Sequence, residues 1–133
     1  MEEGKQLAES LTRELSEVFH VDCPARTVLD HVTSRWGVWV LVCLRRRNLR
    51  FSELRESIEG ISEKMLSQTL RTLVRDGLVW RTVEPTTPPK VTYGLTPVGK
   101  GTSESLTGLF DWIRGHATDI LTVQAEFDRV NSR

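Results

Sequence analysis

The chain has 133 residues, enough for one domain with helical extensions but too few for two independent cores. Its 38% hydrophobic and 27% charged residues exclude disordered and collagen-like classes, and its two cysteines exclude a disulfide-rich framework and favour a reducing cytosol. Because 18 basic and 18 acidic side chains balance, the whole chain lacks the positive charge that marks many nucleic-acid binders.

The first part of the sequence predicts three helices. Residues 6–20 place apolar side chains at helical spacing. A second helix begins at Cys23-Pro24, because proline fits the first helical position, where its missing N–H costs nothing. Residues 36–44 are apolar nearly all round, and because this run is less than half of a membrane span we expect a central buried helix. The start of the chain shows no secretion signal, so we expect a cytoplasmic protein without a membrane partner.

Two further helices follow at the spacing of a helix-turn-helix. Residues 51–58 carry a short apolar stripe, for which Ser52 is the predicted N-cap. Ser62 is the predicted N-cap of a longer helix at residues 63–76, which Gly77 closes. The order of these helices is typical of a DNA-binding motif.

After this motif the apolar period changes from helical to alternating. Residues 78–83 and 91–95 alternate as strands do, and three prolines in the segment between them predict a stiff hairpin tip. Thr96-Pro97 then starts a last helix, which extends to about residue 122. The sequence therefore predicts a β-hairpin followed by a C-terminal helix.

The helix at residues 63–76 has two contrasting faces. At about 100° per residue, Lys64, Gln68 and Arg71 fall on one side together with a serine and a further arginine, and leucines occupy the other side. Arginine can donate two hydrogen bonds to guanine, glutamine can pair with adenine, and serine and lysine reach phosphates. This face therefore suits a DNA major groove, the alternative being an amphipathic helix whose outer side is merely solvated.

Charge is segregated along the chain. Residues 35–90 hold eleven basic and six acidic side chains, a net charge of +5, whereas residues 1–34 sum to −4 and residues 91–133 to −1. A basic middle predicts one surface that faces a polyanion, with an arginine-rich solvated face as the alternative.

Seven short motifs occur in one order over roughly residues 20–115. They are Cys23-Pro24, Arg35-Trp36, Arg50-Phe51-Ser52-Glu53-Leu54, the run from Gly60 to Leu70, Asp76-Gly77-Leu78-Val79, the run from Pro88 to Tyr93, and the run from Leu95 to Gly99. In this order the chain resembles the HxlR-type winged helix-turn-helix transcriptional regulators, relatives of the MarR group. It departs from their pattern at Ser34, where the family usually has glycine, and at Gly37 and Gly94.

The resemblance implies a mainly α fold with a small β-hairpin wing (α+β), built as a single domain over residues 1–133. The DNA-binding core and wing would cover residues 23–95, between dimerisation helices at residues 6–20 and 96–122. These two terminal helices carry apolar stripes that are too large for so small a core to cover, so they would pack between two subunits. Packing inside one chain is the alternative.

The implied function is sequence-specific binding of double-stranded DNA by a homodimeric, nucleoid-associated regulator of transcription, on a pseudo-palindromic operator. The predicted DNA contacts of the recognition helix are Ser62, Lys64, Met65, Ser67, Gln68 and Arg71, and those of the wing are Arg81, Thr86, Thr87 and Lys90.

The resemblance also implies a switch at Cys23, where family members often carry a cysteine that senses oxidants or electrophiles. The helix N-terminus favours a reactive thiolate, whereas Asp22 disfavours a second negative charge, so a silent structural cap is the alternative. Pairing of Cys23 with the same cysteine of a second subunit is the specific form of this hypothesis, and a small ligand near the dimer interface is the other effector. Cys43 is interpreted as a small buried hydrophobic residue.

No pattern in the sequence predicts catalysis. A glycine-rich phosphate loop, a nucleophile elbow and a His-Glu-x-x-His motif are missing, and His20 and Cys23 lack two further metal ligands. We therefore expect no enzyme activity, no metal and no cofactor. Two other functions stay open: a winged-helix protein-interaction module without specific DNA binding, and a ligand-binding protein whose pocket is lined by Trp36, Trp39, Trp80 and Trp112.

Overall fold

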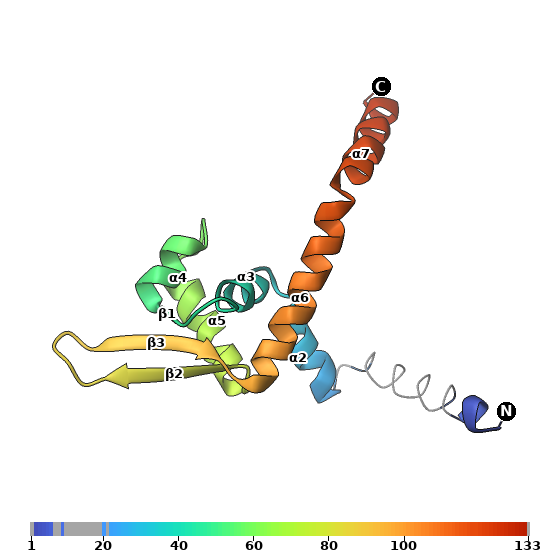
Figure 1. Ribbon diagram of the computed structural model, residues 1–133. Helices are drawn as coiled ribbons and strands as arrows, with labels where there is room; N and C mark the ends of the chain where they lie inside the picture. Colours follow the sequence, from blue (N-terminus) through green and yellow to red (C-terminus); the bar gives the residue numbers. More distant parts are fainter. Residues whose placement is uncertain (1, 7–8, 10–19, 21, 133) are drawn as a thin grey trace.

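Helices and strands follow one another largely in the predicted order (Figure 1). The computed structural model describes residues 2–6, 9, 20 and 22–132, so the predicted helix at residues 6–20 lies almost wholly outside the described residues. The elements from residue 24 onward are α2 (Pro24–Val32), α3 (Arg35–Cys43), β1 (Leu49–Arg50), α4 (Phe51–Ser57), α5 (Glu63–Arg75), β2 (Val79–Glu84), β3 (Lys90–Leu95), α6 (Pro97–Gly115) and α7 (Ala117–Asn131).

Side-chain caps define the ends of the predicted helices. The Oγ of Ser62 accepts a hydrogen bond from the backbone N–H of Met65 at 3.1 Å, which fixes the start of α5. The Oγ1 of Thr96 accepts one from the N–H of Gly99 at 3.0 Å at the start of α6. Gly77 has a φ of 76°, the left-handed conformation that closes α5. These three predictions are confirmed.

The unusual glycine in α3 serves a close approach between helices. Ser34 is the N-cap of α3: its Oγ accepts from the N–H of Gly37 at 3.1 Å and donates to the carbonyl oxygen of His31 at 2.7 Å. A Cβ at position 37 would collide with that same carbonyl. Glycine therefore lets the first turn of α3 pack on the last turn of α2, and α3 begins at Arg35, one residue before the predicted start.

The prediction of Ser52 as an N-cap is wrong. The backbone N–H of Arg50 donates to the Oε1 of Glu53 at 2.9 Å, and α4 begins directly at Phe51. The reason is the short strand β1, which the sequence did not predict and which pairs Arg50 with Thr92 of β3. The chain passes from strand to helix without a loop in which Ser52 could act as a cap.

The predicted hairpin is confirmed and belongs to a three-stranded antiparallel sheet of order β1-β3-β2. Val79 lies opposite Leu95 and Glu84 opposite Lys90, which leaves residues 85–89 as the tip. Trp80 lies opposite Gly94, where a Cβ would collide with the indole ring. This contact explains the glycine that departs from the family pattern.

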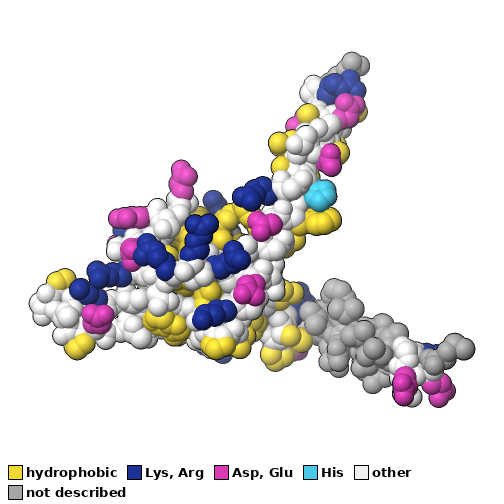
Figure 2. Space-filling model, in the orientation of Figure 1, with side chains coloured by type: hydrophobic (Ala, Val, Ile, Leu, Met, Phe, Trp, Pro, Cys, Tyr) yellow, Lys and Arg dark blue, Asp and Glu magenta, His cyan; other side chains and the backbone are white. Residues whose placement is uncertain are grey.

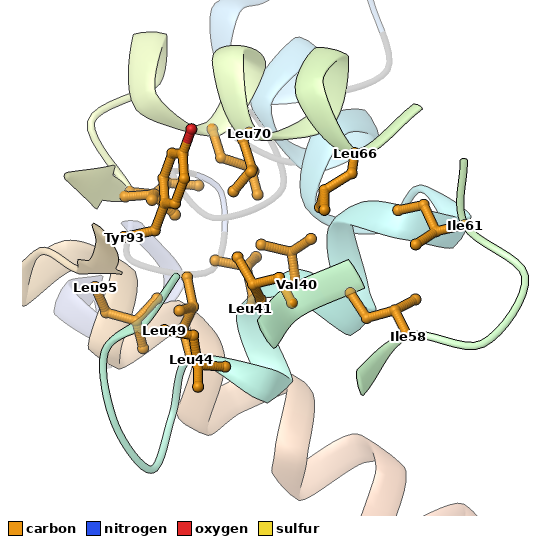
Figure 3. Close-up of a cluster of buried hydrophobic side chains, with 14 of the residues drawn as sticks. Val40, Leu41, Leu44, Leu49, Ile58, Ile61, Leu66, Leu70, Tyr93 and Leu95 are labelled. Atoms are coloured by element: carbon orange, nitrogen blue, oxygen red, sulfur yellow. The ribbon is translucent and has the colours of Figure 1, made fainter. Parts of the chain in front are cut away.

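The core lies between α3, α5 and the sheet (Figure 3). Val40 and Leu41 of α3 are fully buried, as predicted. The prediction that this helix is buried all round is wrong on one side, because Trp39 is 39% exposed and Cys43 is only half-buried. The ring of Trp39 instead makes an edge contact with Phe110 of α6, with centroids 6.0 Å apart.

A long helical arm leaves the domain at its C-terminal end (Figure 1). The single helix predicted from Thr96 is interrupted at His116, whose φ and ψ of −110° and 14° separate α6 from α7. The ring of His116 packs on that of Trp112, and its Nδ1 is hydrogen-bonded to the carbonyl of Trp112 at 2.8 Å. In the described ranges, no helix combines the length and the apolar character needed to cross a bilayer.

Candidate nucleic-acid interface

Helix α5 has one buried and one solvent-facing side, as its sequence predicts. Leu66, Leu70 and Leu73 are at most 1% exposed. The side chains predicted to read DNA are all exposed, namely Ser62, Lys64, Met65, Ser67, Gln68 and Arg71. Because α5 contacts α3, α2 and β2, its polar side is held facing outward.

A groove of about 450 Å³ separates α5 from the hairpin. Ser67 and Arg71 of α5 line one wall, and Arg81 and Tyr93 of the hairpin line the other. The structure thus brings two predicted site arginines, ten positions apart in sequence, to the same groove. A groove with a guanidinium group on either wall is suited to a DNA strand, whose phosphates bind arginine well.

The hairpin tip borders a second concavity, of about 560 Å³. Thr86, Thr87 and Lys90 line it together with Arg50 of β1 and Ser52 of α4. Arg50 is not among the predicted site residues, because its place beside the tip depends on the pairing of β1 with β3. The signals for Arg50 in the sequence are its place in the basic middle segment and in the motif Arg50-Phe51-Ser52-Glu53-Leu54.

Two acidic side chains near this surface, Glu53 and Glu63, form ion pairs with arginines of the same region. Glu63 accepts from Arg55 at 2.8 Å, and Glu53 accepts from Arg47 at 3.1 Å. The backbone N–H of Arg50 and then the Arg47 guanidinium lower the pKa of the Glu53 carboxyl. Among the ion pairs of the described residues, none involves the predicted contact residues, so their positive charge remains available.

The projecting arm exposes many apolar side chains. Figure 2 shows Lys and Arg gathered over the helical domain and hydrophobic side chains along the projecting arm. In the single chain the arm leaves large side chains exposed, among them Leu109 at 56%, Ile113 at 50% and Phe127 at 64%. Packing inside the described part of the chain therefore does not cover the predicted dimerisation stripe of α6 and α7.

Cys23 is the N-cap residue of α2 and is partly exposed. Its carbonyl accepts the N–H of Thr27 at 3.2 Å, and its thiol makes no capping hydrogen bond. Cys43 differs, because burial raises the pKa of its thiol and so favours the protonated form. Both cysteines are free thiols.

The other candidate chemistry receives no support from the geometry. Over residues 2–6, 9, 20 and 22–132, no three His, Cys, Asp or Glu side chains come together as metal ligands. The tryptophans have separate neighbours: the Arg35 guanidinium lies 4.4 Å from the ring centre of Trp36, whereas Trp39 contacts Phe110 and Trp112 contacts His116.

The sequence matches the family model described as HxlR-like helix-turn-helix over residues 31–120. The chain belongs to the HxlR-like helix-turn-helix family. In this HxlR-like regulator of transcription, α4 and α5 form the helix-turn-helix and the β2–β3 hairpin forms the wing. The matched range includes every predicted DNA-contact residue and begins after Cys23.

Relatives agree with this assignment. The chain is 49% identical over 119 residues to YtfH, an uncharacterized HTH-type transcriptional regulator of Escherichia coli, with 88% of this chain and 94% of the relative covered. The solved structure of the regulator ytfH from Salmonella typhimurium is 47% identical, with a TM-score of 0.76 over 80% of this chain and 96% of that one. The redox regulator HypR in its reduced form is 28% identical, with a TM-score of 0.69 over 74% and 98%.

Proposed function

We propose that this HxlR-like regulator binds double-stranded DNA sequence-specifically, as a homodimer on a pseudo-palindromic operator. The observation that carries the proposal is the outward row of Lys64, Gln68 and Arg71 on α5, opposite a fully buried leucine face. The row contains hydrogen-bond donors and no carboxylate. Base edges and phosphates accept hydrogen bonds from such side chains.

In this arrangement α5 enters the major groove. Gln68 and Arg71 donate to base edges, Met65 offers an apolar contact to a thymine methyl group, and Ser62, Lys64 and Ser67 reach bases or phosphates. The wing follows the flanking backbone or minor groove with Arg81, Thr86, Thr87 and Lys90.

The exposed apolar side chains of the arm support the homodimer. A second copy of the chain that packs against the exposed apolar side chains of α6 and α7 would form a twofold interface. Two recognition helices would then lie about 34 Å apart, in successive major grooves of one DNA face.

Cys23 is the proposed redox switch of this dimer. Its partly exposed thiol at a helix N-terminus and the likeness to the redox regulator HypR support this role. With peroxide as oxidant, two Cys23 thiols, one from each subunit, lose two electrons and two protons and form a disulfide, while the peroxide becomes two molecules of water. The bond would fix the subunits in an arrangement that changes the spacing of the recognition helices.

Selection from a pool of random duplexes tests the DNA-binding proposal. We expect bound duplexes to be enriched in a repeated half-site with centres about 10 base pairs apart, with retention that weakens as salt rises. A winged helix that serves only as a protein-interaction module would give little retention on any duplex, and that outcome would refute the proposal.

A further inference from the structure

The recognition helix ends at a buried carboxylate. Asp76 is the C-cap residue of α5, and its side chain is only 3% exposed. The C-terminal end of a helix carries partial negative charge, so a carboxylate is unfavourable there. A buried charge in this position needs a specific partner.

His31 is that partner. Its Nδ1 lies 2.6 Å from the Oδ2 of Asp76, and because a carboxylate oxygen accepts, Nδ1 is the donor. Arg75 also approaches, with its Nη1 4.0 Å from Oδ1, but its side chain is 82% exposed and the long contact is screened by water. The hydrogen bond from His31 is short and half-buried, and it therefore fixes the position of the Asp76 carboxylate.

The bond connects two helices that are distant in sequence. His31 lies in the last turn of α2 and Asp76 at the end of α5, 45 positions apart. A concavity of about 220 Å³ lies between these helices, and both His31 and Gln68 line it. The orientation of α2 therefore affects the surface beside the row of Lys64, Gln68 and Arg71 on α5.

We propose that His31 and Asp76 are positioning residues, whose hydrogen bond holds α5 against α2 in the orientation that DNA recognition needs. The inference rests on the proposed function, because it assigns the bond a role in operator affinity and not only in folding. The pair contacts no DNA in this arrangement and acts through the row of Lys64, Gln68 and Arg71. Since Cys23 is the N-cap residue of α2, the same bond joins the helix that follows this cysteine to the recognition helix.

The first test measures affinity for the selected operator and for an unrelated duplex by fluorescence anisotropy. We expect His31→Ala to weaken operator binding by about tenfold while binding to the unrelated duplex changes by less than about twofold. His31→Asn, whose side-chain N–H can replace Nδ1, should restore most of the affinity. Asp30→Asn is the matched control, because it removes a charge from the same helix turn and from a wall of the same concavity.

Unfolding midpoints and amide hydrogen exchange separate positioning from simple stabilisation. We expect faster exchange at residues 72–78 in both His31→Ala and Asp76→Asn, at a temperature where circular dichroism shows each variant folded. The inference would be overturned if the unfolding midpoint fell while two other quantities stayed unchanged. These are the rate of hydrogen exchange at residues 72–78 and the ratio of the affinity for the operator to the affinity for the unrelated duplex. Failure of the unaltered chain to bind DNA would refute the proposed function, whereas the exchange measurement would still decide whether the pair holds the end of α5.

Discussion

Single side chains on the outer face of α5 account for base preference in the proposed complex. Gln68 is exposed on this face, and a glutamine that bonds to an adenine edge loses both bonds when shortened. We expect Gln68→Ala or Arg71→Ala to weaken operator binding by about 1–3 kcal/mol and to relax the base preference at one position of each half-site. Competition binding against single-base operator variants measures this effect. Glu104→Gln, an exposed residue of α6 away from the apolar stripe, is the control, and unchanged operator affinity in Arg71→Ala would show that the helix is wrongly assigned.

Glu53 makes the start of α4 sensitive to acid. Because the N–H of Arg50 and the guanidinium of Arg47 lower the pKa of its carboxyl in the folded chain, the unfolded chain binds that proton more readily. The contribution of Glu53 to the free energy of unfolding is therefore present above the pKa that its carboxyl has in the unfolded chain. This contribution is lost as the pH falls through that pKa toward the lower pKa of the folded chain. We expect Glu53→Gln to lower the urea midpoint at neutral pH and to flatten its decline as the pH falls through the usual glutamate pKa and below it.

Glu56→Gln is the matched control for this acid effect, since it removes a carboxylate from the same helix away from the cap. An equal decline of the urea midpoint in Glu53→Gln and in the unaltered chain would contradict the assigned role of the cap.

At the scale of elements, local chemistry was predictable and long-range contact was not. The range predicted for α5 differs from Glu63–Arg75 by one residue, because a serine cap and a closing glycine act within a few residues of sequence. Strand β1 exists only because Leu49 and Arg50 pair with a strand about forty residues later. The exposed side of α3 likewise depends on where α6 leaves the domain, which no local pattern encodes.

The wing contributes to affinity rather than to base preference in the proposed complex. Lys90 lies at the start of β3 beside the hairpin tip, where it can reach a phosphate. We expect Lys90→Ala to weaken binding to all duplexes similarly and to reduce the slope of log affinity against log salt by about one. Titrations at several salt concentrations measure the slope, with Lys100→Ala of α6 as the control. A loss confined to the operator would mean that Lys90 reads bases.

At the scale of the whole molecule, the candidate site was predicted as a set of residues but not as a shape. The exposed row of α5 follows from helical angles alone, and the structure confirms that its members face solvent. The groove between Arg71 and Arg81 and the place of Arg50 beside the tip required the sheet to be known. Sequence spacing predicts which side chains lie on the same helix or strand. Only the tertiary contacts show which helices and strands form one surface.

The apolar arm predicts that the chain functions as a dimer. Ile120 of α7 is 39% exposed and belongs to the apolar stripe of the arm. We expect Ile120→Glu to yield a folded monomer in analytical ultracentrifugation, because the new charge would be buried in the twofold interface. The affinity of the Ile120→Glu variant for the operator should fall to the affinity of a single chain for an isolated half-site. Ala125→Glu adds the same charge about 140° around α7 and should stay dimeric, and a monomeric unaltered chain would refute the dimer.

The proposed cysteine switch needs the proposed dimer, because each subunit would provide one Cys23. Peroxide treatment should produce a disulfide-linked dimer on a non-reducing gel and change operator affinity, and reduction should reverse both. Cys23→Ser should abolish the link and the response, whereas Cys43→Ser should leave both intact, because burial raises the pKa of the Cys43 thiol and disfavours the reactive thiolate. If peroxide left the operator affinity of the unaltered chain unchanged, Cys23 would be only the N-cap residue of α2 and no redox switch, and a small ligand would remain as the proposed effector.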